Sequence, residues 1–190
     1  MANWLIAGLG NPGPQYEQTR HNVGFWWLDQ LAHEMNATFS VDKKFHGQLA
    51  RCQSSEHTLF LLKPLVFMNR SGQSVAALSK FFKIPLANTL VIHDELDLPV
   101  GTARLKCGGG HGGHNGLRDI IAQTGSKDFL RCRLGIDHPG DSRQVSDYVL
   151  SKPSQTDRQA ILSAIDNSLR ILPEVLSDDL QKAMNWLHSQ

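Results

Sequence analysis

A histidine that follows a glycine-rich loop is the side chain best placed to do chemistry in this sequence. The run from Leu5 to Gly24, LIAGLGNPGPQYEQTRHNVG, begins apolar and continues through Gly8, Gly10 and Gly13. This pattern predicts a strand that ends in a tight loop, which delivers His21 to the start of a helix. Because an imidazole has an ordinary pKa of about 6.5, His21 is a candidate general base near neutral pH.

The same glycines, Gly8, Gly10 and Gly13, fit the G-x-G-x-x-G pattern of dinucleotide-binding folds. In those folds the third glycine lies in the first turn of a helix that receives the pyrophosphate. Here prolines flank Gly13, and the apolar spacing of a helix begins only near Val23. No second strand ends in an acidic residue at the distance that a ribose contact needs. The sequence therefore disfavours a nucleotide site.

Other polar side chains follow the ends of predicted buried strands. Asn11, Asn69 and Asp94 each stand just after such a run. Site residues of open α/β sheets gather at the carboxyl ends of strands, so we expect these side chains to share one cleft with His21. A carboxylate that accepts a hydrogen bond from one imidazole nitrogen leaves the other free to take a proton. Asp94 is therefore expected to orient His21.

Asparagine amides hold a water, a carbonyl or an oxyanion without titrating, which suits Asn11, Asn69 and Asn115. No serine or cysteine stands in a nucleophile-elbow pattern, so attack by an activated water is favoured over an acyl-enzyme. Each residue taken singly has a simpler explanation. Asp94 could cap a turn, Asn11 could satisfy loop backbone and Asn69 could cap a helix. Their combination favours a hydrolytic site.

Further histidines raise the alternative of a metal site, since His93, His111, His114 and His138 are all candidate ligands. No H-E-x-x-H or H-x-H pattern is present. The glycines around His111 and His114 are expected to hold these side chains poorly. We therefore expect no metal, and a metal-dependent hydrolase of small esters or amides is the second interpretation.

Length and composition suit one domain in a reducing compartment. The chain has 190 residues, a net charge of +1 and three cysteines without a C-x-x-C pair. No apolar segment approaches the 18 or so residues of a membrane span, and the amino terminus lacks a signal-peptide pattern. We expect a cytoplasmic protein. Any nucleic-acid binding must depend on a local basic patch, because the net charge is close to zero.

Alternating strand and helix patterns predict a single α/β domain over residues 1–190, with a mixed, twisted sheet between helical layers. Strands are expected at 5–8, 39–53, 58–63, 89–93, 102–106 and 130–134. Helices are expected at 24–35, 117–124, 155–172 and 178–188. One more is expected to begin with Ser71 as its N-cap and to end before Pro85, and Pro173 is expected to end the 155–172 helix. Because the strands within residues 39–63 are expected to form a hairpin, we do not expect a purely parallel sheet.

Two predicted strands carry alternating basic residues, Arg104 and Lys106 on one and Arg131 and Arg133 on the other. Successive strand residues point to opposite faces, so pairing of these strands would place all of these side chains on one polar face. Alternation alone fits a solvated face and a binding surface equally well. A non-catalytic RNA-binding module is the third interpretation.

Between these strands runs the glycine-rich loop, Gly108 to Gly116, with the sequence GGGHGGHNG. It lacks the G-K-[ST] ending of a nucleotide P-loop. Its backbone amides could hold an anion or a carbonyl near the amino terminus of the next helix. The loop is a weak phosphate signal and a plausible substrate loop.

Several motifs, in this order over nearly the whole chain, together resemble one known family. They are Gly8-Leu-Gly-Asn-Pro-Gly13, Arg20-His-Asn-Val-Gly24, Lys63-Pro64 with Phe67-Met-Asn69, His93-Asp-Glu-Leu-Asp97, the glycine-rich loop, and Gly135-Ile136 with His138-Pro-Gly140. The chain resembles the bacterial-type peptidyl-tRNA hydrolases. The resemblance implies hydrolysis of the ester between a peptide, or an N-blocked amino acid, and the terminal ribose of tRNA, which recycles tRNA from stalled translation. It implies no cofactor.

The resemblance also implies roles for individual residues. His21 matches the general base, Asp94 its support, and Asn11 the residue that tells blocked from free amino groups. Lys106 and Arg133 match a basic clamp for the tRNA 5′ phosphate. The residues matching the groove for the peptide and the tRNA 3′ end are Tyr16, Phe67, Met68, Asn69, His114 and Asn115.

Two positions depart from the family pattern. Val66 stands where threonine is usual, and Ser142 stands where many relatives have lysine. The second departure affects the tRNA-binding surface, and Arg143 is a candidate substitute. Peptidyl-tRNA is the expected partner, no membrane is expected, and a monomer is expected because no broad apolar stripe is left unpaired.

Overall fold

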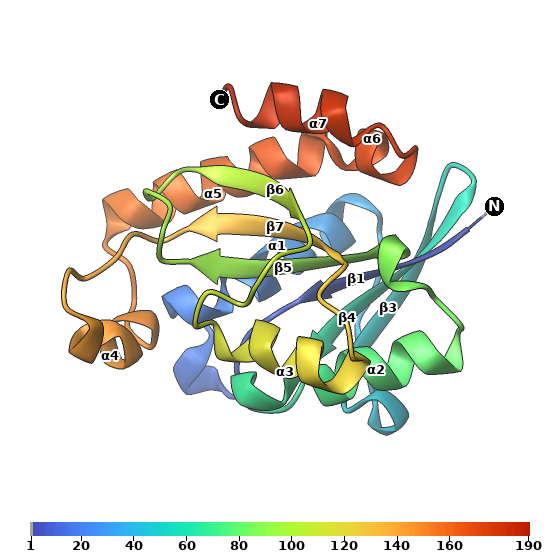
Figure 1. The fold of residues 1–190 in the computed structure, drawn as a ribbon, viewed down its shortest axis with the longest axis horizontal. Coiled ribbons are helices and arrows are strands. Elements are labelled where there is room, and N and C mark those ends of the chain that lie inside the picture. Colours follow the sequence, from blue (N-terminus) through green and yellow to red (C-terminus); the bar gives the residue numbers. More distant parts are fainter. Residues whose placement is uncertain (1) are drawn as a thin grey trace.

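The computed structural model describes residues 2–190. Its centre is a mixed sheet of seven strands (Figure 1). The strand order is β2-β3-β4-β1-β5-β7-β6. The central strands β4, β1, β5 and β7 are parallel, while β2, β3 and β6 pair antiparallel with their neighbours. The strands are β1 (Asn3–Gly8), β2 (Ser40–Asp42), β3 (Gly47–Ser54), β4 (His57–Pro64), β5 (Thr89–Glu95), β6 (Ala103–Cys107) and β7 (Leu130–Gly135).

Strand β1 is central because both of its faces are apolar. Trp4 and Ile6 pack into one core, and Leu5 and Ala7 pack into the other. All four side chains are at most 6% exposed. An apolar run without polar alternation is typical of a strand covered on both sides.

Helices form a layer on each face of the sheet, as Figure 1 shows. The first core contains residues of α1, α5, α6 and α7, and the second contains residues of α2 and α3. The predicted three-layer α/β architecture is confirmed. The helices are α1 (Val23–Glu34), α2 (Ser71–Phe81), α3 (Asn115–Thr124), α4 (Val145–Val149), α5 (Gln155–Arg170), α6 (Leu172–Leu176) and α7 (Leu180–Leu187).

The prediction of a single strand over residues 39–53 is wrong. This segment is divided into β2 and β3 by a 3-10 turn over Lys43–Phe45, after which His46 adopts a left-handed conformation with φ of 52°. Phe45 enters the second core and is 2% exposed. Burial of this ring reverses the chain, so β2 and β3 form a hairpin of their own.

Two helix boundaries also differ from the prediction. Ser71 does not cap α2 but is its first residue, and its hydroxyl donates to the carbonyl of Met68 at 2.8 Å. Pro173 does not simply end a helix, because it lies in the first turn of α6. Proline is tolerated there, since the first helical N–H groups have no partner within the helix.

The site lies at the edge where the parallel strands end. In Figure 1 the arrows of β5 and β7 point toward α4, a short helix that the sequence did not predict. The loops after β1, β4 and β5 end at this same edge, as expected for strands of one direction. Among residues 2–190, each helix is too short or too polar to cross a lipid bilayer.

Candidate active site

The imidazole of His21 is hydrogen-bonded to the carboxylate of Asp94. Its Nδ1 lies 2.9 Å from Asp94 Oδ2. Asp94 is 3% exposed and ends the buried part of β5. An ionised carboxylate only accepts hydrogen bonds, so the proton of a neutral His21 lies on Nδ1. Nε2 then carries the lone pair, which is the arrangement that a general base requires.

Both neighbours of His21 in the chain are anchored. Arg20 donates through Nη1 to the carbonyls of Tyr148 and Ser151, at 3.2 and 3.3 Å. Asn22 accepts from the backbone N–H of Asn11 and donates to its carbonyl, both at 2.9 Å. The short 3-10 turn that carries His21 is therefore tied to α4 on one side and to the glycine-rich β1 loop on the other.

His114 is the second imidazole on Asp94, with Nε2 lying 2.8 Å from Asp94 Oδ1. Its Nδ1 accepts from the backbone N–H groups of Gly116 and Leu117 at 3.1 and 3.3 Å and so caps α3. The Nε2 atom therefore carries the proton and donates it to Asp94. The expectation that flanking glycines would hold His114 poorly is wrong, because the helix cap and the carboxylate fix the ring from both sides.

The ionisation states follow from these contacts. Burial alone would raise the pKa of Asp94, but its interactions with His21 and His114 hold the pKa well below the usual range. Burial lowers the pKa of His21, and the charge and hydrogen bond of Asp94 outweigh this effect, so the pKa of His21 is raised. Asp94 is thus a carboxylate throughout the physiological range, and His21 is a stronger base than free imidazole.

Asn11 is positioned by the chain on the other side of the cleft. Its Oδ1 accepts from the backbone N–H of Met68 at 2.7 Å, and the residue is 7% exposed. Its Nδ2 donates to none of the residues 2–190 in the structure. The amide N–H groups of Asn11 are therefore available to an acceptor in the cleft.

The cleft has a volume of about 460 Å³ and contains most of the predicted site residues. One wall is apolar and comes from α4 and its ends, with Val145, Val149 and Leu150. Tyr16 is not part of the lining but contacts Phe67 edge to face, with ring centroids 6.4 Å apart. The predicted residues that line the cleft are Asn11, His21, Phe67, Met68, Asn69, Asp94, His114 and Asn115.

The predicted basic face forms where β6 pairs with β7. Arg104 lies opposite Arg133, and Lys106 lies opposite Arg131. Arg133 already forms an ion pair with Glu95, because its Nε lies 2.9 Å from Glu95 Oε1. Arg131 differs from the prediction of a polar surface, because it is 2% exposed and donates to backbone carbonyls.

A second, smaller cavity of about 230 Å³ lies at this basic face. Its lining includes Lys106, Arg131 and Arg133. Glu95, the residue after Asp94, lines this cavity and the catalytic cleft as well. The basic face and the candidate active site are therefore adjacent.

His21, Asp94 and His114 are close enough to share a metal ion, with ligand atoms within 4.8 Å of one another. Their hydrogen bonds oppose that use. His114 Nδ1 accepts two backbone N–H groups, so Nε2 holds a proton where a metal ligand needs a lone pair. The residues present fit a hydrogen-bonded group better than a metal centre.

A buried carboxylate that orients an imidazole, in an open cleft at the carboxyl edge of a mixed sheet, is the arrangement of a hydrolase that activates water. A family model described as peptidyl-tRNA hydrolase matches residues 5–190. The chain belongs to the peptidyl-tRNA hydrolase family.

Individual relatives agree with this assignment over nearly their whole length. The peptidyl-tRNA hydrolase of Coxiella burnetii is 57% identical over 185 residues, which is 97% of each chain. That of Neisseria meningitidis is 52% identical over 186 residues, covering 98% of this chain and 97% of the relative. The crystal structure of peptidyl-tRNA hydrolase from Acinetobacter baumannii superposes with a TM-score of 0.94 at 47% identity, covering 97% of this chain and 93% of the other.

Three contributors to the site were not predictable from the motifs. They are the contact of His114 with Asp94, the link that Glu95 makes to Arg133, and the apolar wall of α4. A histidine directly before the helical run from Asn115 can cap it through Nδ1, so the sequence held a signal for the capping role of His114 but none for its contact with Asp94. The α4 wall had no signal, since five residues are too few to show helical periodicity.

Proposed function

We propose that this chain hydrolyses the ester that joins a peptide, or an N-blocked amino acid, to the 3′-terminal ribose of tRNA. The observation that carries the proposal is the Asp94–His21 pair, which leaves His21 Nε2 free in a cleft lined by asparagine amides. Membership of the peptidyl-tRNA hydrolase family supports the choice of ester. The reaction releases free tRNA and peptide.

His21 acts as the general base in this mechanism. Its Nε2 removes a proton from a water molecule, and the water oxygen attacks the ester carbonyl. Asp94 stabilises the imidazolium that forms, because it is already ionised and accepts from Nδ1. The imidazolium then returns the proton to the ribose oxygen as the ester bond breaks, so His21 ends the cycle neutral.

The amides in the cleft stabilise charge and select the substrate. Asn69 and Asn115 lie in the lining and can donate to the oxyanion of the tetrahedral intermediate. Asn11 holds its Oδ1 on Met68, so its Nδ2 faces the substrate as a donor. A blocked amino group supplies an amide carbonyl to accept that bond, whereas a free ammonium has none. This difference accounts for selection of N-blocked esters.

The remaining predicted residues bind the ends of the substrate. Phe67 and Met68 provide apolar contact for the peptide, and Tyr16 supports Phe67 from the rim. Lys106 and Arg133 clamp the 5′ phosphate of the acceptor stem. Phosphate contacts position an RNA without reading its sequence, which suits an enzyme that accepts many tRNAs.

Arg143 is proposed to take part of the role that lysine has at the position of Ser142 in many relatives. Its guanidinium is 88% exposed and pairs with Asp141 at 2.9 Å, next to Ser142 in the cleft lining. Arg143→Ala is expected to weaken binding of tRNA and to lower the salt dependence of binding. An unchanged salt dependence would remove Arg143 from the RNA-binding surface.

The proposed working state is a monomer in the cytoplasm, where translation produces the substrate. Of the exposed large apolar residues, Phe67 and Leu150 line the cleft, and the others lie on three separate elements, Val41 on β2, Phe81 on α2 and Trp186 on α7. The cysteines are free thiols, as in a reducing compartment. Sedimentation at micromolar concentration tests the monomer, and a stable dimer would contradict it.

The function is tested by comparing two esters on the same tRNA, one N-acetylated and one with a free amino group, with and without a chelator. Rapid release from the blocked ester alone, unaffected by the chelator, is the expected result. Loss of activity in the chelator would support the metal-dependent alternative. Binding of tRNA without hydrolysis of either ester would support the RNA-binding module.

A further inference from the structure

Arg131 is a buried cation to which the proposed mechanism gives no role. It lies on β7 and is 2% exposed, and its guanidinium lies over the ring of Phe129 at 4.6 Å. No carboxylate among residues 2–190 pairs with it. Burial lowers the pKa of Arg131, and the neighbouring Arg133 lowers it further. A buried cation is costly unless its donors are satisfied, so the groups that satisfy this one are informative.

Those groups are backbone carbonyls of the glycine-rich loop. Nη1 donates to the carbonyl of Gly110 and Nη2 to that of Gly109, both at 2.5 Å. Nη2 also donates to the carbonyl of Lys127 at 3.2 Å. The planar guanidinium thus binds two successive carbonyls of the loop with two parallel N–H groups, a geometry that lysine does not offer.

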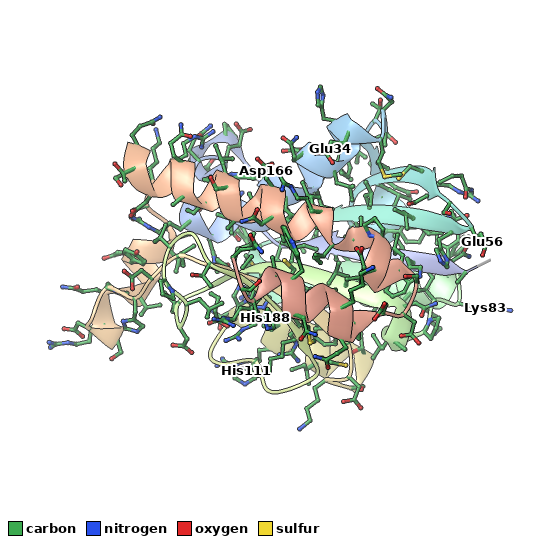
Figure 2. The ribbon with its side chains drawn as sticks, turned by 90° about the horizontal axis from the view of Figure 1, so that it is seen from above. Glu34, Glu56, Lys83, His111, Asp166 and His188 are labelled. Atoms are coloured by element: carbon green, nitrogen blue, oxygen red, sulfur yellow. The ribbon has the colours of Figure 1, made fainter. Side chains whose placement is uncertain are left out.

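The loop has little other support between its ends. A Cβ atom added at Gly110, Gly112 or Gly113 would meet no atom within 4 Å. Gly109, Gly112 and Gly113 have positive φ, which glycine adopts without cost and which leaves the free loop many conformations. In Figure 2, His111 marks this loop at the margin of the molecule, beyond His188 at the end of α7. The contacts of Arg131 therefore restrict a segment that packing leaves open.

The other end of the loop enters the active site. His114 closes the loop with its backbone N–H on the carbonyl of His111 at 2.9 Å, and its ring holds Asp94. Asn115 follows in the cleft lining. The loop is therefore fixed at two places, by Arg131 near its start and by the Asp94–His114 contact at its end.

We infer that Arg131 is a positioning residue, whose guanidinium holds the carbonyls of Gly109 and Gly110 so that His114 and Asn115 are presented to Asp94 and the substrate. This role rests on the proposed function, because its effect is measured as hydrolysis. It differs from that of Lys106 and Arg133, which bind the RNA. Arg131 acts on the bond-breaking step through the loop and not on phosphate binding.

The experiment compares Arg131→Lys and Arg131→Met with the parent enzyme on an N-acetylated aminoacyl-tRNA. Both variants are expected to lower kcat by about 10-fold to 100-fold, since displacement of a site by about 1 Å has effects of this size. The salt dependence of KM is expected to stay unchanged. Arg51→Lys is the matched control, because Arg51 lies over Phe60 at 5.2 Å on β3, away from the cleft, and should retain parental kcat.

Two further measurements separate positioning from general support of the fold. Guanidinium ion at millimolar concentration should raise kcat of Arg131→Ala and leave the parent unaffected, because the truncated side chain leaves the carbonyls of Gly109 and Gly110 without their donor. The double variant Arg131→Lys with His114→Ala should be no slower than His114→Ala alone, because residues that act through one contact are not additive.

Each contrary result overturns the inference. Parental kcat in Arg131→Lys and Arg131→Met would remove the role, and a rise in KM with a flatter salt dependence would make Arg131 a phosphate ligand. Additive losses in the double variant, or variants that no longer fold, would make Arg131 a general structural residue. A parent enzyme that hydrolyses neither ester would instead overturn the proposed function, so the two failures are distinguishable.

Discussion

The imidazole rings of His21 and His114 lie 5.2 Å apart and donate to opposite oxygens of the same carboxylate. The two rings are not equivalent. The second ring nitrogen of His114 accepts hydrogen bonds from the backbone of α3, whereas the second ring nitrogen of His21 is free. One Asp94 carboxylate thus separates a structural histidine from a reactive one, and the predictions below depend on this division.

The first prediction concerns the pH dependence of Asp94→Asn. His21 must be neutral to accept a proton, so kcat/KM of the parent should rise with pH through the raised pKa of His21. Removing the carboxylate leaves burial, which lowers that pKa, so the acid limb should move to lower pH. The plateau rate should fall by about 10²-fold to 10⁴-fold, because the imidazolium loses its partner. Profiles of kcat/KM between about pH 5 and 8.5 measure both effects, and an unmoved limb would contradict them.

The second prediction concerns His21→Ala. This change should lower kcat by about 10²-fold to 10⁴-fold, the usual range for loss of a general base, with affinity for uncharged tRNA largely retained. His33→Ala is a suitable control, since His33 is exposed on α1 and should be silent. A near-parental rate in His21→Ala would assign the base to another group.

The third prediction concerns stability in acid and His93. Burial lowers the pKa of His93 to about 3, and its Nδ1 donates to the carbonyl of Asp94 at 2.8 Å. The unfolded chain protonates this histidine below about pH 6.5, while the folded chain does not. The unfolded state then binds more protons, so the free energy of unfolding should fall by up to about 1.4 kcal/mol per pH unit as pH decreases from about 6.5.

The matched variant for this effect is His93→Asn, which keeps a side-chain donor but does not titrate. The free energy of unfolding of this variant should depend less steeply on pH than that of the parent. The difference in slope should correspond to the uptake of up to one proton on unfolding. Urea unfolding between about pH 6.5 and 5 tests this, above the range in which the carboxyl of Asp94 contributes. Parallel curves for parent and variant would show that His93 is protonated in the folded state.

Much of the fold and the chemistry was predictable, because it depends on local patterns. The apolar run at residues 5–8 predicted the strand that became β1, and the alternation at Arg131 and Arg133 predicted the face that they share with Arg104 and Lys106. The contacts that were missed join residues distant in sequence, as Arg131 to Gly109 and His114 to Asp94 do. Spacing along the chain carries no signal for such contacts, since tertiary packing alone decides which polar atoms meet.

The last prediction compares the two members of the proposed phosphate clamp. Lys106→Ala and Arg133→Ala should raise KM and flatten its dependence on salt, with kcat nearly unchanged, because each loses a contact to phosphate and not to the reacting ester. Lys80→Ala, an exposed change on α2, serves as the control for net charge.

The two effects should differ in size. Arg133 is paired with Glu95 at 2.9 Å, so a phosphate must compete with a carboxylate for it, whereas Lys106 has no ion pair among residues 2–190. Lys106→Ala should therefore raise KM more than Arg133→Ala, and Glu95→Gln should lower KM by freeing Arg133. KM measured from about 50 to 200 mM salt tests the order, since contacts to phosphate weaken steeply over that range. If both alanine variants lowered kcat at constant KM, these cations would serve bond breaking, and the clamp would have to be sought elsewhere on the basic face.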